Sequence, residues 1–157
     1  MIEQAGLKDA RAILEVINCS NREAYRDVIP AEHFREPVLS MEELLEDLRR
    51  MPFYVYRSEG QVVGITALHR ESAESGVIRW MYVLPGYQRR GIGTALLTFL
   101  EGRARELGLR RLQLLAIEGA HWATRFYKKH GYRPFDRIEQ PWGADLLLEK
   151  DLAARGP

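Results

Sequence analysis

Residues 83–94 read Val-Leu-Pro-Gly-Tyr-Gln-Arg-Arg-Gly-Ile-Gly-Thr, which predicts a strand end, a glycine-rich turn and the start of a helix. Gly91 and Gly93 lack a Cβ, so the backbone can turn sharply and a ligand can approach it closely. First-turn amides have no partner inside a helix, and the helix dipole favours negative charge beside them. The amides concerned are those of Gly91, Ile92, Gly93 and Thr94. With Arg89 and Arg90 alongside, the stretch predicts a site for a phosphate or pyrophosphate.

The spacing of the glycines separates three kinds of phosphate site. A P-loop needs a Lys after its last glycine, which is missing after Gly93, and a dinucleotide fingerprint needs a third glycine where Leu96 stands. The remaining pattern, residues 88–93, resembles the Gln/Arg-x-x-Gly-x-Gly/Ala signature by which the GNAT superfamily of N-acetyltransferases holds the pyrophosphate of acetyl-CoA. The plain alternative is a glycine-rich turn that only begins a helix.

Two further segments resemble the same family in the same order. Residues 123–132, Ala-Thr-Arg-Phe-Tyr-Lys-Lys-His-Gly-Tyr, resemble its second signature, Ala-x-x-x-Tyr-x-x-x-Gly-Phe/Tyr. Residues 2–10 are similar to the opening strand and the entry to the first helix. The resemblance therefore covers nearly the whole chain.

Length and composition indicate one soluble globular domain. The chain has 157 residues, 46% hydrophobic and 29% charged, with a formal net charge of +1. We expect a single domain over residues 1–152 and a short tail over 153–157. The near-neutral charge gives no case for nucleic acid as an obligatory partner, and no apolar run reaches the ~20 residues that span a bilayer. With a lone Cys19 and no secretory signal at the start, we expect a cytoplasmic protein.

Hydrophobic periodicity predicts an alternating α/β pattern. The first half predicts a strand over 2–5, helices over 8–18 and 20–29, and a helix from Met41 to about Arg50 with a capping box begun by Ser40. Strands over 53–57, 62–70 and 77–83 follow as an antiparallel meander. The second half predicts a helix over 92–107 ended by Gly108, a strand over 111–117, a helix over 120–130 and strands over 132–138 and 145–150.

The strand-helix-strand order between residues 80 and 117 calls for a right-handed crossover and a parallel pair. We therefore expect an α/β fold with a largely antiparallel mixed sheet, flanked by helices, whose parallel pair splays apart at the ligand site.

The resemblance implies a division of labour within that site. Backbone groups of Met81, Tyr82 and Val83 would pair with the pantetheine arm of acetyl-CoA, and the amide of Val83 would stabilise the oxyanion. Tyr127 would protonate the departing sulfur. The pyrophosphate would be bound by Gln88, Arg89, Arg90, Gly91, Ile92, Gly93 and Thr94. Acetyl-CoA is then the cosubstrate, and we expect no metal.

Two departures from the family leave the general base open. Ala120 stands where many members have an Asn that contacts pantetheine, and Leu115 stands where ribosomal-protein acetyltransferases carry a glutamate base. Glu118, His121 and His69 are the candidates for the base. A base acting through water, or no dedicated base, are further alternatives.

The resemblance implies an acetyl-CoA-dependent N-acetyltransferase acting on a primary amine of a small molecule, peptide or protein by direct attack in a ternary complex. It places the acceptor near residues 20–34 and 136–143, where Tyr25, Trp142, Glu23 and Asp136 suit a cationic amine. The alternative is a non-catalytic module that binds acetyl-CoA or CoA as a sensor or interaction subunit. We expect neither nucleic acid nor membrane as a partner, and a homodimer through the last strands is possible.

Overall fold

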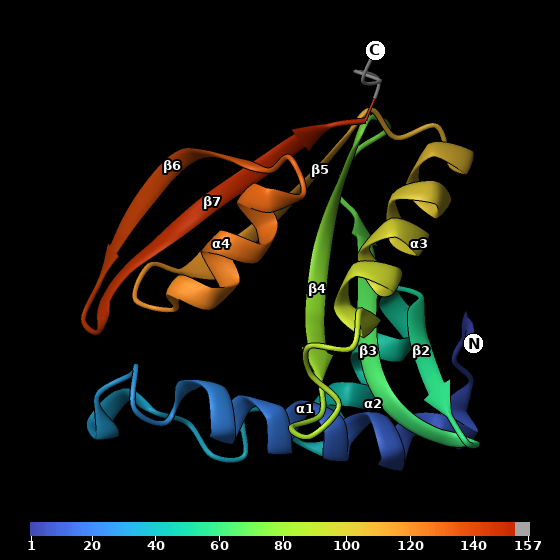
Figure 1. Ribbon diagram of the computed structural model, residues 1–157, viewed down its shortest axis with the longest axis horizontal. Helices are drawn as coiled ribbons and strands as arrows, with labels where there is room; N and C mark the ends of the chain where they lie inside the picture. Colours follow the sequence, from blue (N-terminus) through green and yellow to red (C-terminus); the bar gives the residue numbers. More distant parts are fainter. Residues whose placement is uncertain (153–157) are drawn as a thin grey trace.

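One mixed sheet of seven strands organises the computed structural model, which describes residues 1–152 (Figure 1). The strands are β1 (Ile2–Gln4), β2 (Phe53–Ser58), β3 (Gln61–Arg70), β4 (Ser75–Val83), β5 (Arg111–Ile117), β6 (Arg133–Gln140) and β7 (Gly143–Asp151). The helices are α1 (Ala10–Tyr25), α2 (Met41–Arg50), α3 (Ile92–Glu106) and α4 (His121–Lys129), with two 3-10 helices, η1 (Leu7–Asp9) and η2 (Ala31–His33). The tail expected over 153–157 lies outside the described residues.

The sheet order β1-β2-β3-β4-β5-β7-β6 contains a single parallel pair, β4 with β5, joined through α3. The two strands pair only from Ser75 opposite Arg111 to Val77 opposite Gln113, and then they part. Beyond that point β5 keeps its other neighbour, β7, along its full length. The predicted mixed sheet with a splayed parallel pair is therefore confirmed, and the opening lies toward the carboxyl ends of β4 and β5 (Figure 1).

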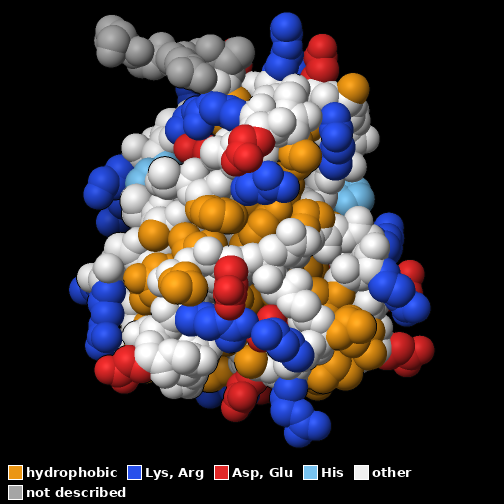
Figure 2. All heavy atoms as spheres, turned by 90° about the vertical axis from the view of Figure 1, so that its right-hand side faces the viewer, with side chains coloured by type: hydrophobic (Ala, Val, Ile, Leu, Met, Phe, Trp, Pro, Cys, Tyr) orange, Lys and Arg blue, Asp and Glu red, His pale blue; other side chains and the backbone are white. Residues whose placement is uncertain are grey.

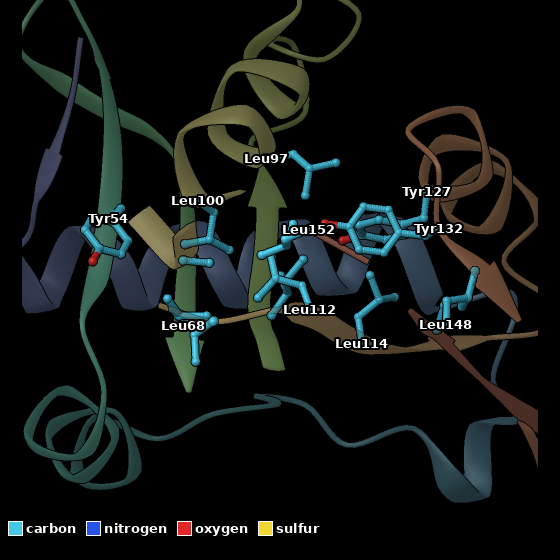
Figure 3. Packing of buried hydrophobic residues seen from close by; sticks show 14 residues of the cluster. Tyr54, Leu68, Leu97, Leu100, Leu112, Leu114, Tyr127, Tyr132, Leu148 and Leu152 are labelled. Atoms are coloured by element: carbon cyan, nitrogen blue, oxygen red, sulfur yellow. The ribbon is translucent and has the colours of Figure 1, made fainter. Parts of the chain in front are cut away.

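Helices cover both faces of the sheet. Helices α1 and α2 pack on one face, where Ile13, Ile17 and Leu44 meet Val55 and Ile65. Helices α3 and α4 lie on the opposite face, and Figure 3 shows the side chains that meet there. These include Leu97, Leu100, Leu114, Tyr127 and Leu148. The hydrophobic effect of burying both layers holds the splayed sheet in place.

One predicted boundary in the first half is wrong. The sequence predicts two helices over 8–18 and 20–29, whereas α1 runs unbroken from Ala10 to Tyr25. The first two residues of the second predicted helix, Ser20 and Asn21, are polar, and in the structure they point inward and find partners. The Ser20 hydroxyl donates to the carbonyl of Val83 over 3.3 Å, and Asn21 accepts from the Tyr82 hydroxyl over 3.3 Å. Helix α1 therefore continues past Asn18 and reaches the opening between β4 and β5.

A buried polar cluster fastens α3 to β7 at the end of the sheet where β4 and β5 are paired. The Tyr132 hydroxyl donates to Glu101 over 2.8 Å, and the Lys150 ammonium lies 3.1 Å and 3.2 Å from the two oxygens of the same carboxylate. Tyr132 and Glu101 are buried. The Glu101 carboxylate therefore depends on the Tyr132 hydroxyl and the Lys150 ammonium for its hydrogen bonds. The cluster ties the two halves of the sheet together across the α3 face.

The surface seen from the right-hand side of Figure 1 carries charges of both signs around scattered apolar patches, without one continuous basic field (Figure 2). Among residues 1–152, no helix has the length and apolarity needed to cross a membrane.

Candidate active site

A bulge in β4 shapes the opening. Tyr82 pairs with Ile65 and Arg79 with Ala67, so Trp80 and Met81 together face one residue of β3. Trp80 takes the left-handed conformation, with φ at 57°. No glycine marks this place, and the aromatic run around Trp80 is typical of a regular strand, so the bulge was not predictable from the local residues.

The backbone of Val83 faces away from β3 and into the opening. Leu84 donates its amide to the carbonyl of Val63 over 2.8 Å, which makes Leu84 and Val63 a hydrogen-bonded pair. In an antiparallel ladder the adjacent pair, Val83 with Gly64, is then of the other kind, whose amides and carbonyls point outward. The carbonyl of Val83 accepts instead from Ser20 and, over 3.2 Å, from the Gln88 side chain. The Val83 amide is left facing the opening.

The start of α3 forms an anion-binding concavity. Gly91, the N-cap, has a φ of 81° and Arg89 a φ of 64°, both left-handed, with Arg90 between them. Such alternation of hand turns successive amides toward a common point. No side chain caps the helix and its first turn holds no acidic residue. The first bond inside the helix runs from the Ala95 amide to Gly91 over 3.0 Å, so the amides before Ala95 are available to a ligand.

Gly93 lies where the α3 start approaches α4. A Cβ on this residue would sit 3.4 Å from the ring of Phe126, already in van der Waals contact. A larger side chain would therefore have to extend over the amides of the first turn or displace Phe126. The residues present thus leave a bare backbone surface, positively polarised, of the kind a diphosphate needs.

A cavity of about 840 Å³ extends from this concavity into the gap between β4 and β5. Its volume is within the range of about 300–1,000 Å³ that is usual for small-molecule sites. Nine of the ten predicted coenzyme residues line it: Met81, Tyr82, Val83, Gln88, Arg89, Gly91, Ile92, Gly93 and Thr94. Arg90 does not, because its guanidinium lies over the Tyr87 ring at 5.0 Å from the centroid.

Tyr127 lies on the α4 wall of the cavity, and its ring contacts those of Phe126 and Tyr132. Figure 3 shows Tyr127 beside Tyr132. Its side chain is buried, and no hydrogen bond from another residue of 1–152 satisfies its hydroxyl. Burial raises the pKa of the phenol well above its usual value, with the nearby phenols of Tyr25 and Tyr82 adding to the effect. Tyr127 therefore stays neutral and keeps a proton to donate.

Three phenols from three elements surround the same space. Tyr25 comes from the last turn of α1, Tyr82 from β4 and Tyr127 from α4, and all three line the cavity. Burial raises the pKa of Tyr25 and of Tyr82, so these hydroxyls also stay protonated. The aromatic walls and neutral hydroxyls solvate a charge poorly, so an unpaired charge in this part of the cavity would be costly.

The three predicted base candidates lie away from the cavity lining. Glu118 forms a bidentate ion pair with Arg137, whose Nε and Nη2 donate to its two oxygens over 2.8 Å and 3.0 Å. This pairing lowers the pKa of the Glu118 carboxyl. His121 is exposed at the start of α4, and His69 lies near the end of β3. None of the three is a lining residue. Glu118 in particular is a poor base, because Arg137 stabilises its charged form.

The one carboxylate among the lining residues is Glu23, on α1 two residues before Tyr25. The sequence places it in the acceptor region by resemblance but does not distinguish it from the other carboxylates there. The unbroken helix α1 distinguishes Glu23 from them, because it brings its last turns to the cavity. Asp27, Glu32 and Asp136 are not lining residues.

Solved structures share this fold over nearly its whole length. The N-acetyltransferase PaiA of Thermoplasma acidophilum, crystallised in complex with coenzyme A, is 22% identical with a TM-score of 0.83, covering 96% of this chain and 98% of that one. The ribosomal-protein-alanine N-acetyltransferase of Brucella melitensis is 23% identical with a TM-score of 0.77, covering 96% and 99%. At these identities the likeness concerns the fold.

Sequence relatives agree with the fold. An amino-acid acetyltransferase of Pseudomonas putida (strain GB-1) is 29% identical over 135 residues, which are 85% of this chain and 28% of that protein. The chain thus spans a little over a quarter of the length of such relatives. The model of the acetyltransferase (GNAT) family matches residues 14–132, from α1 to the end of the second signature. The chain belongs to the acetyltransferase (GNAT) family.

Proposed function

We propose that this protein transfers the acetyl group of acetyl-CoA to a primary amine by direct attack in a ternary complex. The observation that carries the proposal is the junction of two features in one cavity: the uncapped, acid-free start of α3 and the buried Tyr127 hydroxyl. Acetyl-CoA, when bound, supplies an activated acyl group on sulfur. Transfer forms a C–N bond and breaks the C–S bond, and of the two protons that the ammonium loses, one ends on the thiol and one in solvent.

The chain's own residues orient the thioester. The amides of residues 92–94 and the Arg89 side chain hold the diphosphate, and the edge of β4 that β5 leaves free holds the pantetheine arm. The Val83 amide is directed to the acyl oxygen, where a fixed donor stabilises developing negative charge. Ser20 and Gln88 hold the Val83 carbonyl and thereby position the end of β4 beside the acyl group.

Tyr127 serves the departing sulfur as a hydrogen-bond donor. A thiol has a pKa of about 8.5 in water, lower than that of an ordinary phenol and much lower than that of this buried one. Complete transfer of the phenolic proton to the sulfur would therefore be uphill. A hydrogen bond that strengthens as charge develops on the sulfur lowers the barrier without that transfer. This refines the role of proton donor that the resemblance implies.

Glu23 is our candidate for receiving the amine's proton, directly or through a water molecule. It is the one carboxylate lining the cavity, and no ion pair to another described residue engages it. Glu118, His121 and His69 are set aside for this role because none of them lines the cavity.

Tyr127→Phe is the test of the proposed chemistry. It should lower kcat by about 100-fold or more, within the usual range for loss of a positioned acid, and leave the Kd for acetyl-CoA within about 2-fold. Tyr56→Phe, the same change on β2 outside the cavity, is the control and should leave kcat unchanged. A kcat that survives Tyr127→Phe would remove this residue from the mechanism.

A transfer assay separates the proposal from the non-catalytic alternative. The full chain is incubated with acetyl-CoA labelled in the acetyl group and pools of amines, and labelled amides are counted. Binding of acetyl-CoA by calorimetry without transfer to any amine would identify a coenzyme-binding module rather than an enzyme.

A further inference from the structure

We propose that the acceptor is a small primary amine with an aromatic body and no carboxylate, rather than a free amino acid. This inference rests on the proposed function and narrows its substrate class. The P. putida relative is by contrast an amino-acid acetyltransferase. The balance of charge in the cavity and the shape of its far end support a different acceptor here.

The cavity lining contains no free basic side chain that could pair with a carboxylate of the acceptor. Its lining contains a single basic residue, Arg89, which lies in the turn before α3 where the diphosphate is held. Of the arginines outside the lining, Arg90 lies over Tyr87, Arg137 binds Glu118 and Arg22 pairs with Glu36. An α-amino acid brings one ammonium and one carboxylate. Here the carboxylate would enter a largely apolar space without a counter-ion, which is costly.

The same space has one group suited to an ammonium. Glu23 lines the cavity, is exposed at its α1 edge, and forms no salt bridge within residues 1–152. On the opposite wall, Leu115 lines the cavity at a position where the family can carry a carboxylate, and it is 54% exposed. One carboxylate and an apolar wall match a monocation with an apolar body.

Aromatic side chains of the cavity lining would surround the apolar part of the acceptor. Tyr25 of α1 and Trp122 of α4 meet across the opening with ring centroids 5.9 Å apart and planes tilted by 41°. Trp80 and Tyr82 add a second, stacked pair from β4, with centroids 6.4 Å apart. Aromatic faces attract both apolar rings and cations. The cavity therefore offers rings on both sides of the space beside Glu23.

Contacts between the two halves of the fold favour a small acceptor over a peptide. Besides the Tyr25–Trp122 pair, His33 of η2 meets Trp142 of the β6–β7 turn with centroids 6.1 Å apart. A Cβ at Gly119 would lie 3.3 Å from Val28, so these backbone segments are also close. In Figure 1 the end of α1 runs beneath the β6–β7 hairpin. These contacts join α1 and the segment after it to the start of α4 and to the β6–β7 hairpin, which leaves less room there for an extended peptide.

The test compares acceptors that share one ring and differ in charge. The full chain with acetyl-CoA is given 2-phenylethylamine, phenylalaninamide, phenylalanine, ethylamine or the tripeptide Phe-Ala-Ala, and thiol release is measured. We expect kcat/KM for phenylalanine to be about 100-fold or more below that for phenylalaninamide, which is nearly the same size without the carboxylate. Ethylamine should fall about 10-fold or more below 2-phenylethylamine because it lacks the ring.

A pair of variants tests the partner of the ammonium. Glu23→Gln should raise KM for 2-phenylethylamine about 10-fold, because the ammonium loses its counter-ion, and should also lower kcat, because Glu23 is the proposed acceptor of the amine's proton. The Kd for acetyl-CoA should stay within about 2-fold. Glu15→Gln, on the exposed side of the same helix, is the matched control and should change none of these. Unchanged KM in Glu23→Gln would overturn the assignment of Glu23.

The remaining outcomes are also decisive. Phenylalanine turned over as well as its amide would overturn the inference while leaving the acetyltransferase intact. Turnover of the tripeptide alone would overturn it in favour of peptide amino termini. Acetyl-CoA binding with no acceptor turned over would overturn both this inference and the proposed function.

Discussion

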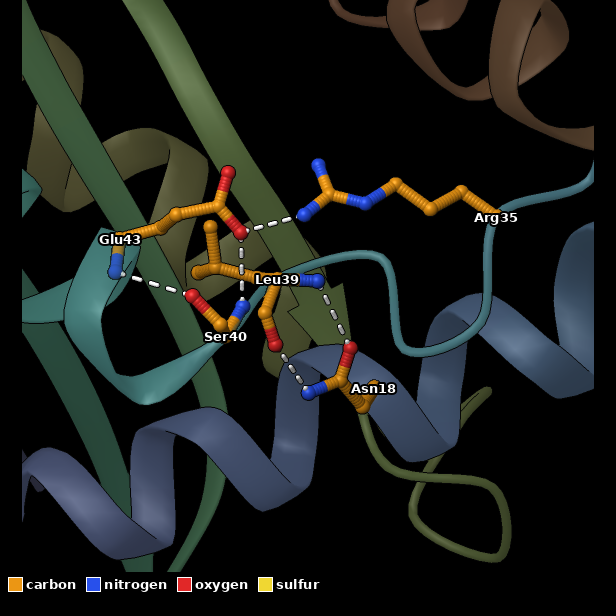
Figure 4. A network of polar contacts seen from close by, with 5 residues as sticks. All are labelled: Asn18, Arg35, Leu39, Ser40 and Glu43. Atoms are coloured by element: carbon orange, nitrogen blue, oxygen red, sulfur yellow. Dashed lines mark hydrogen bonds and ion pairs between the residues drawn. The ribbon is translucent and has the colours of Figure 1, made fainter.

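Helices α2 and α3 begin in opposite ways, and the contrast supports the proposed coenzyme site at the start of α3. At the start of α2, the Ser40 hydroxyl accepts from the Glu43 amide over 3.1 Å, and the Glu43 carboxylate accepts from the Ser40 amide over 3.0 Å (Figure 4). At the start of α3, Gly91 takes the cap position, no side chain caps the helix, and no acidic residue occupies the first turn. One helix start is closed by its own side chains and the other is left open.

The closed start is also held from outside. Arg35 donates to the Glu43 carboxylate over 2.5 Å, and the Asn18 amide group makes two hydrogen bonds with the backbone of Leu39 just before the cap (Figure 4). These contacts fix the connection between α1 and α2. A helix start that only needs stability thus satisfies its amides internally, whereas α3 forgoes this stabilisation and keeps its amides for a ligand.

An acidic residue in the first turn of α3, like that of α2, should have the largest effect of the changes considered, and the effect should be on acetyl-CoA binding. Thr94 occupies in α3 the third helical position that Glu43 occupies in α2. Thr94→Glu should weaken acetyl-CoA binding about 100-fold, because the added carboxylate faces the diphosphate. Folding should be unharmed, since an acid at a helix start is worth about 0.3–1 kcal/mol in favour of the helix.

Calorimetric Kd values and urea unfolding of the same samples measure the two effects separately. Thr98→Glu, on the exposed side one turn later, is the control and should leave the Kd nearly unchanged. Equal affinity in Thr94→Glu and the native chain would mean that the diphosphate lies elsewhere.

Two glycines of α3 sharpen the comparison through stability. Gly91→Ala should destabilise the fold by about 1–2 kcal/mol, because its φ of 81° is strained for any residue with a Cβ. Gly102→Ala, in the interior of the same helix with open space around its Cβ, should stabilise it by up to about 1 kcal/mol. Urea unfolding of both variants should therefore give shifts of opposite sign. A Gly91→Ala variant as stable as the native chain, or more stable, would contradict the left-handed cap.

Local sequence patterns predicted most elements of the fold well. The capping box of α2 has its residues three apart, and the helix begins and ends where expected, at Met41 and Arg50. Strand β5 likewise has its predicted bounds, Arg111–Ile117. Gly108 ends α3 as expected, one residue beyond the cap, with a φ of 81° and with Leu109 bonded back to Ala104 over 2.9 Å.

Features that depend on distant partners were not predictable in the same way. Ser20 and Asn21 are typical of a helix break until their partners on β4 are known, and those partners lie more than 60 positions away. The left-handed Trp80 has no local signature. The ion pair between Glu118 and Arg137 of β6 also joins residues 19 positions apart, and no local pattern predicts it. The site's wall and charges are thus tertiary facts, whereas its glycine turn is a local one.

The smallest expected effect concerns the acid stability of the closed start. Hydrogen bonds from Arg35, and then from Ser40, lower the pKa of Glu43 from 4.5 to about 2. A group whose pKa is lowered by folding stabilises the fold fully above pH 4.5, and this contribution is lost as the pH falls toward 2. Glu43→Gln should therefore be less stable than the native chain at pH 6, and the two unfolding curves should approach each other as the pH falls through this window.

The effect should be modest, because the Glu43 side chain is 43% exposed and solvent screens its pairing with Arg35. Denaturant unfolding at a series of pH values measures the gap between the two curves, and acetyl-CoA affinity at pH 7 should be the same for both proteins. A constant gap down to pH 2 would show that the Glu43 carboxylate is not stabilised by folding. A change in acetyl-CoA affinity would instead show that the two helix starts are coupled, since α2 contributes no residue to the coenzyme cavity.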